Sequence, residues 1–139
     1  MENYKKSVNA ILVNSKKQIL LHLRDNNPKI LYPNYWACIG GGVEDNESEL
    51  EGLKREVKEE INYSINNFKY LDKFYLRKDK ILCSVYVGYL DVCEEEIKLT
   101  EGQCVKFFYP DEIRNLKMLR IIKKIIHKNL KKILSMADN

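Results

Sequence analysis

The stretch Gly41–Tyr63, GGVEDNESELEGLKREVKEEINY, is the most informative part of this 139-residue chain. Behind a glycine-rich turn it places three glutamates, Glu56, Glu59 and Glu60. Because an α-helix advances about 100° per residue, these carboxylates share one narrow arc of a helix surface, where they repel one another. Carboxylate oxygens are hard ligands that suit Mg²⁺ or Mn²⁺, so the arc predicts a cation site. Taken alone, the same triplet also fits a solvated acidic helix face.

The helix is expected to begin at Ser48, because Glu51 follows three residues later in the pattern of a capping box. A stripe of apolar residues beside the carboxylate arc predicts its buried face: Leu50, Leu53, Val57 and Ile61. Gly52 inside the helix destabilises it by roughly 1 kcal/mol relative to alanine. We therefore expect another backbone to approach closely there, with the Gly40–Gly42 turn as the candidate.

The segment resembles the signature of the Nudix hydrolases, G-x5-E-x7-R-E-U-x-E-E-x-G-U, where U is aliphatic. The matching residues are Gly41, Glu47, Arg55, Glu56, Val57, Glu59 and Glu60. Asn62 stands at the second glycine of the signature, and Asn46 replaces a common glycine before Glu47. Asparagine is the non-glycine residue that best tolerates a left-handed backbone, so both keep that conformation available. Asn62 can therefore still end the helix.

The resemblance also implies roles for the residues of the signature. It implies four metal ligands: the carboxylates of Glu56, Glu59 and Glu60 and the carbonyl of Gly41. Glu59 is in addition a candidate catalytic base. Arg55 and Glu47 are expected to pair in a bidentate contact that fixes the turn against the helix. Glu101 precedes a strand-like run, where many relatives carry a further acid that acts as ligand or base.

The rest of the chain shows the pattern of a mixed α/β protein, and its length favours one domain over residues 1–139. By resemblance, the fold is a Nudix-type α/β/α sandwich with a mixed central sheet. The predicted strands are Ser7–Asn14, Gln18–Arg24, Tyr35–Ile39, Phe68–Arg77, Ile81–Leu90 and Cys104–Phe108. Pro110 is expected to open a short helical turn, and one amphipathic helix is expected over Met118–Ser135.

Composition restricts the class of protein further. No apolar run reaches the roughly 18 residues of a membrane span, and the N-terminal residues lack a signal-peptide core. The four cysteines, Cys38, Cys83, Cys93 and Cys104, form no C-x-x-C pair, and each lies in or beside an apolar run. Buried reduced thiols are favoured over disulfides or zinc ligands, and we expect a cytoplasmic protein.

Most of the formal net charge of +4 lies in the last quarter of the chain. A lysine-rich helix face can bind RNA, a membrane surface or another polyanion, but it is more often a solvated outer surface. Nucleic-acid binding is disfavoured here, because no aromatic residues interleave the lysines for base stacking. His127 is expected on this surface. For His22 a structural role is favoured over one in the substrate groove.

The substrate is expected to be a nucleotide derivative, because the family cleaves a nucleoside diphosphate linked to another group. Candidate substrate-binding residues are Arg24, Tyr35 and Trp36, although the core is slightly favoured for Trp36. Lys78 stands where ADP-ribose hydrolases tend to carry a proline. The small size favours a MutT-like enzyme that uses Mg²⁺ or Mn²⁺ to convert a nucleoside triphosphate into the monophosphate and pyrophosphate.

Two other functions stay open at this point. One is an enzyme similar to the isopentenyl diphosphate isomerases, with Cys38 as the nearest candidate for their active-site cysteine. The other is a non-catalytic nucleotide sensor of the same fold, although such proteins usually lose signature glutamates.

Overall fold

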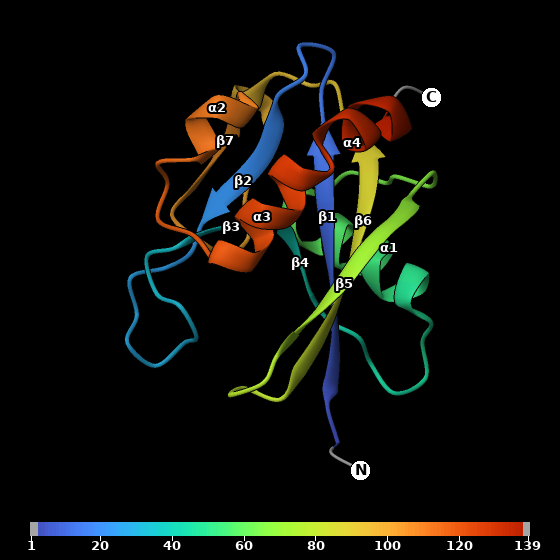
Figure 1. The fold of residues 1–139 in the computed structure, drawn as a ribbon, viewed down its shortest axis with the longest axis vertical. Coiled ribbons are helices and arrows are strands. Elements are labelled where there is room, and N and C mark those ends of the chain that lie inside the picture. The colour runs from blue at the N-terminus through green and yellow to red at the C-terminus, as the bar shows by residue number, and fades with distance from the viewer. Residues whose placement is uncertain (1–2, 138–139) are drawn as a thin grey trace.

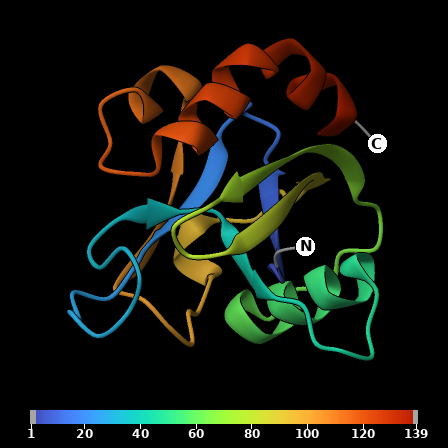
Figure 2. The ribbon, with the colours of Figure 1, turned by 60° about the horizontal axis from the view of Figure 1, so that its bottom comes forward.

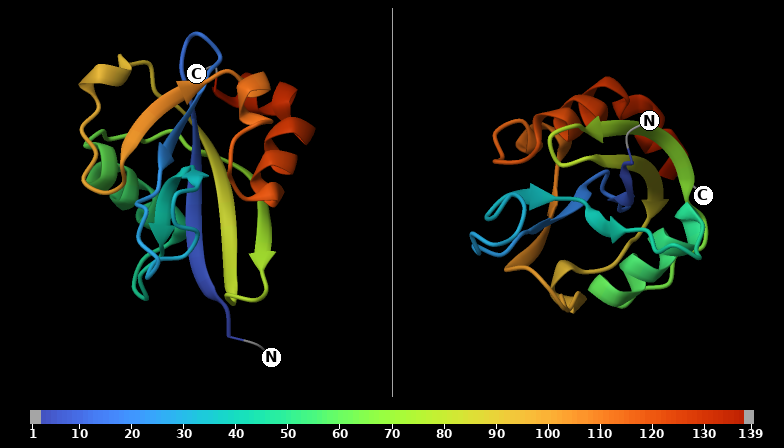
Figure 3. Two further views of the ribbon diagram at one scale, coloured as in Figure 1. Left: turned by 90° about the vertical axis from the view of Figure 1, so that its left-hand side faces the viewer. Right: turned by 90° about the horizontal axis from the view of Figure 1, so that it is seen from below.

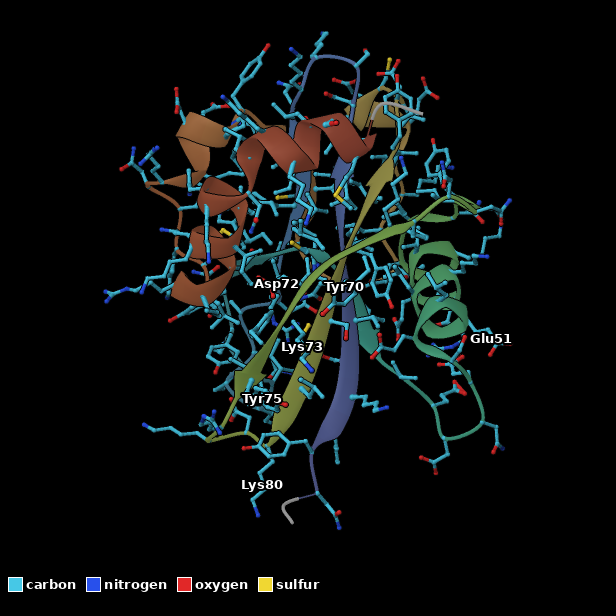
Figure 4. The ribbon with its side chains drawn as sticks, turned by 45° about the vertical axis from the view of Figure 1, so that its right-hand side comes forward. Glu51, Tyr70, Asp72, Lys73, Tyr75 and Lys80 are labelled. Carbon is cyan, nitrogen blue, oxygen red and sulfur yellow. The ribbon has the colours of Figure 1, made fainter. Side chains whose placement is uncertain are left out.

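Strand β1 (Lys5–Val13) organises the sheet in the computed structural model, which describes residues 3–137 (Figure 1). Along its whole length β1 pairs in parallel with β6 (Ile81–Tyr89). Strand β5 (Lys69–Leu76) pairs antiparallel with β6 and forms one edge of the sheet. The exposed side chains of Tyr70, Lys73 and Tyr75 lie along this edge strand (Figure 4).

The sheet splits on the other side of β1. Strand β2 (Ile19–Leu23) pairs with β1 only at Val13, whereas β4 (Ile39–Gly42) pairs with β1 from Ser7 to Ala10. Both pairings are antiparallel. Strands β3 (Trp36–Ala37) and β7 (Cys104–Phe108) pair with β2, which completes the mixed sheet of seven strands. The split separates β2 and β3 from β4.

Helices cover both faces of the sheet. Helix α1 (Glu49–Ile61) lies on one face, and α3 (Arg120–Lys128) and α4 (Leu130–Ala137) lie on the other (Figures 2 and 3). The short helices η1 (Glu94–Glu96) and α2 (Pro110–Ile113) lie in connections. The predicted α/β/α sandwich is confirmed. The domain expected over residues 1–139 extends two residues beyond the described part at each end.

Successive side chains of β1 point to opposite faces of the sheet, so the strand contributes to two separate apolar cores. Val8, Ala10 and Leu12 pack with the buried residues of α1. Ile11 and Val13 point to the opposite face and pack with the isoleucines of α3 and α4. Each helical layer therefore has its own buried contact with the same central strand.

Most predicted strands are present with ends within two residues of the observed ones. The prediction over Tyr35–Ile39 is wrong in form, because two short strands replace one. The glycines Gly40–Gly42 belong to β4 and pair with β1, so they form a strand rather than a turn. Without side chains they let α1 approach this strand closely.

Both ends of α1 follow the sequence prediction. The Ser48 hydroxyl accepts a hydrogen bond from the Glu51 N–H, and the Glu51 carboxylate accepts one from the Ser48 N–H. Asn62 ends the helix in the left-handed conformation, with φ 62° and ψ 32°. Asn46 is not among the described residues with positive φ, so the structure uses only one of the two asparagines in this way.

Two expectations inside α1 are corrected. Leu53, Val57 and Ile61 are buried, but Leu50 is 40% exposed, because the sheet lies beneath the other three positions. Gly52 does not face a backbone. An ideal Cβ built on Gly52 would lie 2.9 Å from the Glu47 carboxylate, so the glycine makes room for a side chain of the signature.

The start of α1 is held against the sheet by a contact that the sequence pattern did not indicate. The Glu49 carboxylate accepts hydrogen bonds from the hydroxyls of Ser84 (2.9 Å) and Tyr86 (2.8 Å), both on β6. This contact fixes the end of the helix that is farther from Glu60.

Substitutions at Asn62 test the helix end. Because Asn62 is in the left-handed region, Asn62→Gly should leave the free energy of unfolding unchanged or raise it slightly. Asn62→Val should lower it by about 1 kcal/mol or more, since a β-branched side chain is disfavoured there. Denaturant unfolding of both variants measures this difference. Equal stability of the glycine and valine variants would contradict the left-handed helix end.

The helix expected over Met118–Ser135 is two helices. Both the backbone N–H and the side-chain amide of Asn129 donate to the Ile125 carbonyl, at 3.1 and 2.9 Å. This local capping competes with helix continuation, and the Asn129 backbone leaves the helical region at φ −110°. Leu130 then begins α4.

Two further corrections concern exposure. Cys38 and Cys83 are buried free thiols as expected, whereas Cys93 and Cys104 are free but exposed. His127 is not a free surface residue. Its ring nitrogens lie 2.8 Å from the Lys123 carbonyl and 3.2 Å from the Pro110 carbonyl. Within residues 3–137, no helix is both long and apolar enough to cross a membrane.

Candidate active site

Arg55 forms hydrogen bonds with several parts of the signature. Its Nε and Nη2 donate to the two oxygens of Glu47, at 3.1 and 2.6 Å, which is the predicted bidentate pair. Nη2 also donates to the Gly42 carbonyl (2.9 Å). Nη1 donates to Glu56 and Glu59, both at 3.2 Å. One guanidinium therefore ties the turn before the helix, the end of β4 and two of the three clustered glutamates together.

The charge state of the pair follows from this contact. The hydrogen bonds from Arg55 lower the pKa of Glu47, and the same contact raises the pKa of Arg55. Glu47 is ionised at neutral pH, and the guanidinium stays protonated.

Glu56 packs directly against β4. An ideal Cβ built on Gly41 would lie 2.5 Å from the Glu56 carboxyl carbon, so only glycine leaves room for this carboxylate. Burial raises the pKa of Glu56, and the contact with Arg55 works in the opposite direction. Gly41 thus has a steric role in the site, because its missing side chain leaves space for the Glu56 carboxylate. This role is separate from the ligand role that the resemblance implies for the Gly41 carbonyl.

Glu60 and Glu59 are neighbours in sequence but differ in environment. Glu60 is only 7% exposed, and its carboxylate accepts a hydrogen bond from the Gly40 N–H at 2.9 Å. Burial, reinforced by the negative charges of Glu56 and Glu101, raises the pKa of Glu60 to about 8. The side chain of Glu59 is 58% exposed. Of the two, Glu59 is free to change rotamer.

The loop that carries Glu101 is attached to the end of α1. The Thr100 N–H donates to the Glu60 carbonyl (3.2 Å), and the Thr100 hydroxyl donates to the Glu59 carbonyl (3.0 Å). Glu101 is exposed, and its charge contributes to the raised pKa values of Glu56 and Glu60. Glu101, distant in sequence from the signature, therefore lies at the carboxylate cluster. Thr100 is a positioning residue that the sequence analysis missed.

A pocket of about 290 Å³ opens where β1 splits from β2, close to the lower size limit for small-molecule sites. Its wall includes Gly40–Gly42 of β4, so the pocket and the carboxylate cluster share this strand. Arg24, Tyr35 and Trp36, the three predicted substrate-binding residues, all line it. Phe74, Leu76 and Ile81 of the β5–β6 hairpin form an apolar wall.

The pocket residues are held by contacts between segments. Trp36 stacks edge-on against Phe108, with ring centroids 4.9 Å apart, and packs against the core while also lining the pocket. Arg24 Nε donates to the Leu31 carbonyl, and the Gln103 amide donates to the Arg24 carbonyl. Gln103 thereby connects the loop of Glu101 to the pocket.

His22 lines the pocket from β2 and is buried. Burial, assisted by the nearby charge of Arg24, lowers its pKa to about 4, so the imidazole is neutral at physiological pH. Its Nδ1 has no hydrogen-bond partner among the described residues. An ideal Cβ on Gly102 would lie 3.2 Å from this Nδ1, so the ring packs beneath the loop of Glu101. His22 is therefore both a buried structural residue and part of the pocket wall, the two roles considered from the sequence.

The carboxylates of the cluster are candidate ligands for a divalent cation. As the side chains lie, no three His, Cys, Asp or Glu residues in the described part converge closely enough to hold a metal ion. Arg55 draws Glu56 and Glu59 toward itself, while Glu60 turns to Gly40. The residue types still fit a divalent cation, because carboxylate oxygens are hard ligands. Glu60 is also buried near the negative charges of Glu56 and Glu101, which a cation would offset. For the three carboxylates to converge, Glu56 and Glu59 would each have to give up the contact with Arg55, and Glu59 is the more exposed of the two.

Comparison with known proteins agrees with this geometry. The sequence model of the NUDIX domain matches residues 3–130. The chain belongs to the Nudix hydrolase family. Two curated relatives are the RNA pyrophosphohydrolases of Ruthia magnifica subsp. Calyptogena magnifica (36% identity over 72 residues) and Pasteurella multocida strain Pm70 (33% over 78 residues). The matches cover 52% and 55% of this chain but only 37% and 36% of those relatives.

Solved structures show the same Nudix fold. The MutT protein from Methanosarcina mazei Go1 has a TM-score of 0.78 and 24% identity, with 94% of this chain and 96% of that chain covered. The NUDIX domain of Shewanella oneidensis NrtR, solved with ADP ribose, has a TM-score of 0.73 and 14% identity, with 94% and 90% covered. At these identities the similarity concerns the fold.

Proposed function

We propose that this Nudix protein is a divalent-cation-dependent pyrophosphohydrolase that cleaves a nucleoside triphosphate to the monophosphate and pyrophosphate. One observation carries the proposal: the Glu56 carboxylate packs on Gly41, and Gly41 also lines the pocket beside Tyr35 and Trp36. A nucleoside in the pocket thus directs its phosphates along β4 toward the carboxylates. The family membership supports the hydrolase chemistry.

Glu56, Glu59 and Glu60 would hold the cation, with the Gly41 carbonyl as a further ligand. When bound, Mg²⁺ or Mn²⁺ would offset the charge of the phosphates and polarise the attacked phosphorus. The Gly40 N–H orients Glu60 through the hydrogen bond at 2.9 Å.

Arg55 and Glu47 hold the turn against the helix, and Arg55 at the same time orients Glu56. Two exposed carboxylates are candidates for removing a proton from the attacking water, Glu59 and Glu101. Glu59 leads by resemblance, and Glu101 is brought to the cluster by Thr100. In the pocket, Trp36 and Tyr35 offer rings to the nucleoside, and Arg24 offers a positive charge.

The products test the proposal directly. With Mg²⁺ and a nucleoside triphosphate, phosphorus NMR should show the monophosphate and pyrophosphate, because the pocket fixes the nucleoside and places an inner phosphorus at the carboxylates. Ca²⁺, which has looser coordination, should slow the reaction while still permitting binding. Orthophosphate as the sole initial inorganic product would contradict the proposed position of attack.

A second substrate is favoured by the comparisons. The curated relatives are named RNA pyrophosphohydrolases, which supports the triphosphate at the 5′ end of an RNA chain as an alternative to a free nucleotide. Both substrates would present the same triphosphate to the carboxylates, so the chemistry above is unchanged.

The other two functions are less well supported. For an isomerase, Cys38 is the nearest cysteine, but it is buried and burial raises its pKa to about 12. Such a thiol is a poor proton donor at neutral pH. A non-catalytic sensor has no need of the complete set of signature glutamates that this chain retains.

A further inference from the structure

The charge of the chain is divided between two regions. Residues 114–137 hold eight of the 24 lysines and arginines and none of the 20 aspartates and glutamates. This segment therefore carries +8, and the remainder, with 16 basic and 20 acidic residues, carries −4. Among residues 3–137 only one cation of the segment forms an ion pair, Arg114 with the exposed Asp111 at 3.9 Å.

These cations form an outward surface on the C-terminal helices. Most apolar residues of α3 and α4 pack against the sheet, whereas Ile121, next to Arg120, is 37% exposed. The exposed cations, which we call the basic face, are Lys117, Arg120, Lys124, Lys128, Lys131 and Lys132. Arg120, Lys124 and Lys128 follow one another at intervals of four residues, so each lies about 6 Å along α3 from the next.

The basic face begins at the rim of the pocket. The Trp36 N–H donates to the Lys117 carbonyl at 2.8 Å, which joins β3 to the start of α3. Three residues next to this junction, Met118, Leu119 and Ile122, line the pocket. A ligand that leaves the pocket past Lys117 therefore reaches Arg120 directly.

Aromatic rings stand at the same rim. The Lys117 ammonium lies 5.1 Å from the centroid of the Tyr35 ring, and the Tyr35 and Tyr32 rings lie 5.4 Å apart. The Tyr32 hydroxyl donates to Asp79 at 2.8 Å, which fixes this ring pair relative to the β5–β6 turn. Rings beside cations are what a single-stranded nucleic acid requires, because bases stack on the rings while phosphates meet the cations.

We propose that the basic face binds the single-stranded RNA that follows a 5′-triphosphorylated nucleotide held in the pocket. The proposal deepens the function proposed above and rests on it for the triphosphate. The first base occupies the pocket beside Trp36 and Tyr35, the next stacks at Tyr32, which packs against Tyr35, and the following phosphates meet Arg120, Lys124 and Lys128. The observations favour RNA over a membrane surface, because Ile121 is the only large apolar side chain exposed on the described helices α3 and α4, and one side chain is a weak anchor for lipid.

The test replaces Arg120, Lys124 and Lys128 together by glutamine. The matched control replaces Lys16, Lys54 and Lys98, three exposed lysines on other parts of the molecule, and removes the same charge. On a short 5′-triphosphorylated single-stranded RNA, kcat/KM of the first variant should fall roughly tenfold or more at low salt. The slope of log K against log[salt] should decrease by about 2, as expected for three lost phosphate contacts.

On a free nucleoside triphosphate both variants should keep the wild-type kcat/KM, because neither set of residues touches the pocket. Equal activity of the first variant and the control on RNA would overturn the proposal. So would a binding loss confined to vesicles of anionic lipid, which would identify the face as a membrane surface.

A direct binding assay keeps this inference separate from the catalytic proposal. If the wild-type protein hydrolyses neither substrate, the proposed function fails, but fluorescence anisotropy with labelled single-stranded RNA still tests the face. Weaker binding by the first variant than by the control supports the basic face. Equal binding by both variants overturns it.

Discussion

Glu60→Gln is expected to lower kcat at least ~10²-fold and, in the metal-free protein, to raise the free energy of unfolding. The activity falls because glutamine cannot supply the negative oxygen that a cation requires. The stability rises because Glu60 is buried beside Glu56 and Glu101, so its charge is unfavourable without a cation. Steady-state kinetics with Mg²⁺ and denaturant unfolding in a chelator measure the two effects.

The gain in stability has a defined pH dependence. The folded-state pKa of Glu60, about 8, lies above the value near 4.5 of an unperturbed carboxyl. The unfolded chain therefore releases this proton first, and the wild-type protein loses stability as pH rises from about 4.5 to about 8. The advantage of Glu60→Gln should grow across this range to on the order of 5 kcal/mol above pH 8, and it should vanish below pH 4.5.

Two control variants sharpen this test. Glu59→Gln should also lower kcat about 10²-fold, but it should change the free energy of unfolding less than Glu60→Gln does, because the Glu59 side chain is mostly exposed. Glu95→Gln, on an exposed glutamate away from the cluster, should change neither quantity. Near-normal turnover of both the Glu59 and Glu60 variants would refute the site assignment.

Arg55→Lys is expected to lower kcat roughly 10²-fold although the positive charge is retained. A lysine ammonium cannot make the bidentate contact with Glu47 and also reach the Gly42 carbonyl and Glu56. The turn and the Glu56 carboxylate would both lose their fixed positions. The free energy of unfolding should also fall, because Glu47 would lose part of its hydrogen bonding.

Arg77→Lys is the matched control for this variant. Arg77 is exposed, lies over the Tyr75 ring and forms no ion pair with the described residues, so its replacement should leave kcat unchanged. Wild-type kinetics for Arg55→Lys would mean that charge alone, and not the geometry of the guanidinium, supports the signature.

The sequence predicted the parts of the site that depend on local spacing. The capping box of Ser48 and Glu51, the left-handed Asn62 and the pairing of Arg55 with Glu47 are all present. Each joins residues within two turns of one helix or the loop before it, so helical periodicity and side-chain length are enough to specify it.

Reasoning from hydrophobic periodicity failed where a strand pairing with a distant segment or a hydrogen bond made by a polar side chain decided the outcome. The sequence marks Gly40–Gly42 as flexible, but pairing with β1 makes the segment a strand. The pattern of Met118–Ser135 fits one helix, but the amide of Asn129 divides it. Neither the strand pairing nor the Asn129 hydrogen bond can be read from the spacing of apolar residues in the sequence.

The sequence by itself therefore determined the signature loop and helix. It also determined the apolar stripe of this helix and the apolar face of the strand on which the stripe packs. Only the tertiary structure brought Glu101 to the carboxylates, through Thr100, and joined Gly41, Trp36 and the apolar hairpin in one pocket. It also supplied Tyr35 beside Lys117, the ring that the lysine-rich segment lacks in its own sequence. These contacts join residues far apart in the chain, and their geometry is set by strand pairing and by the split of the sheet, which no local pattern encodes.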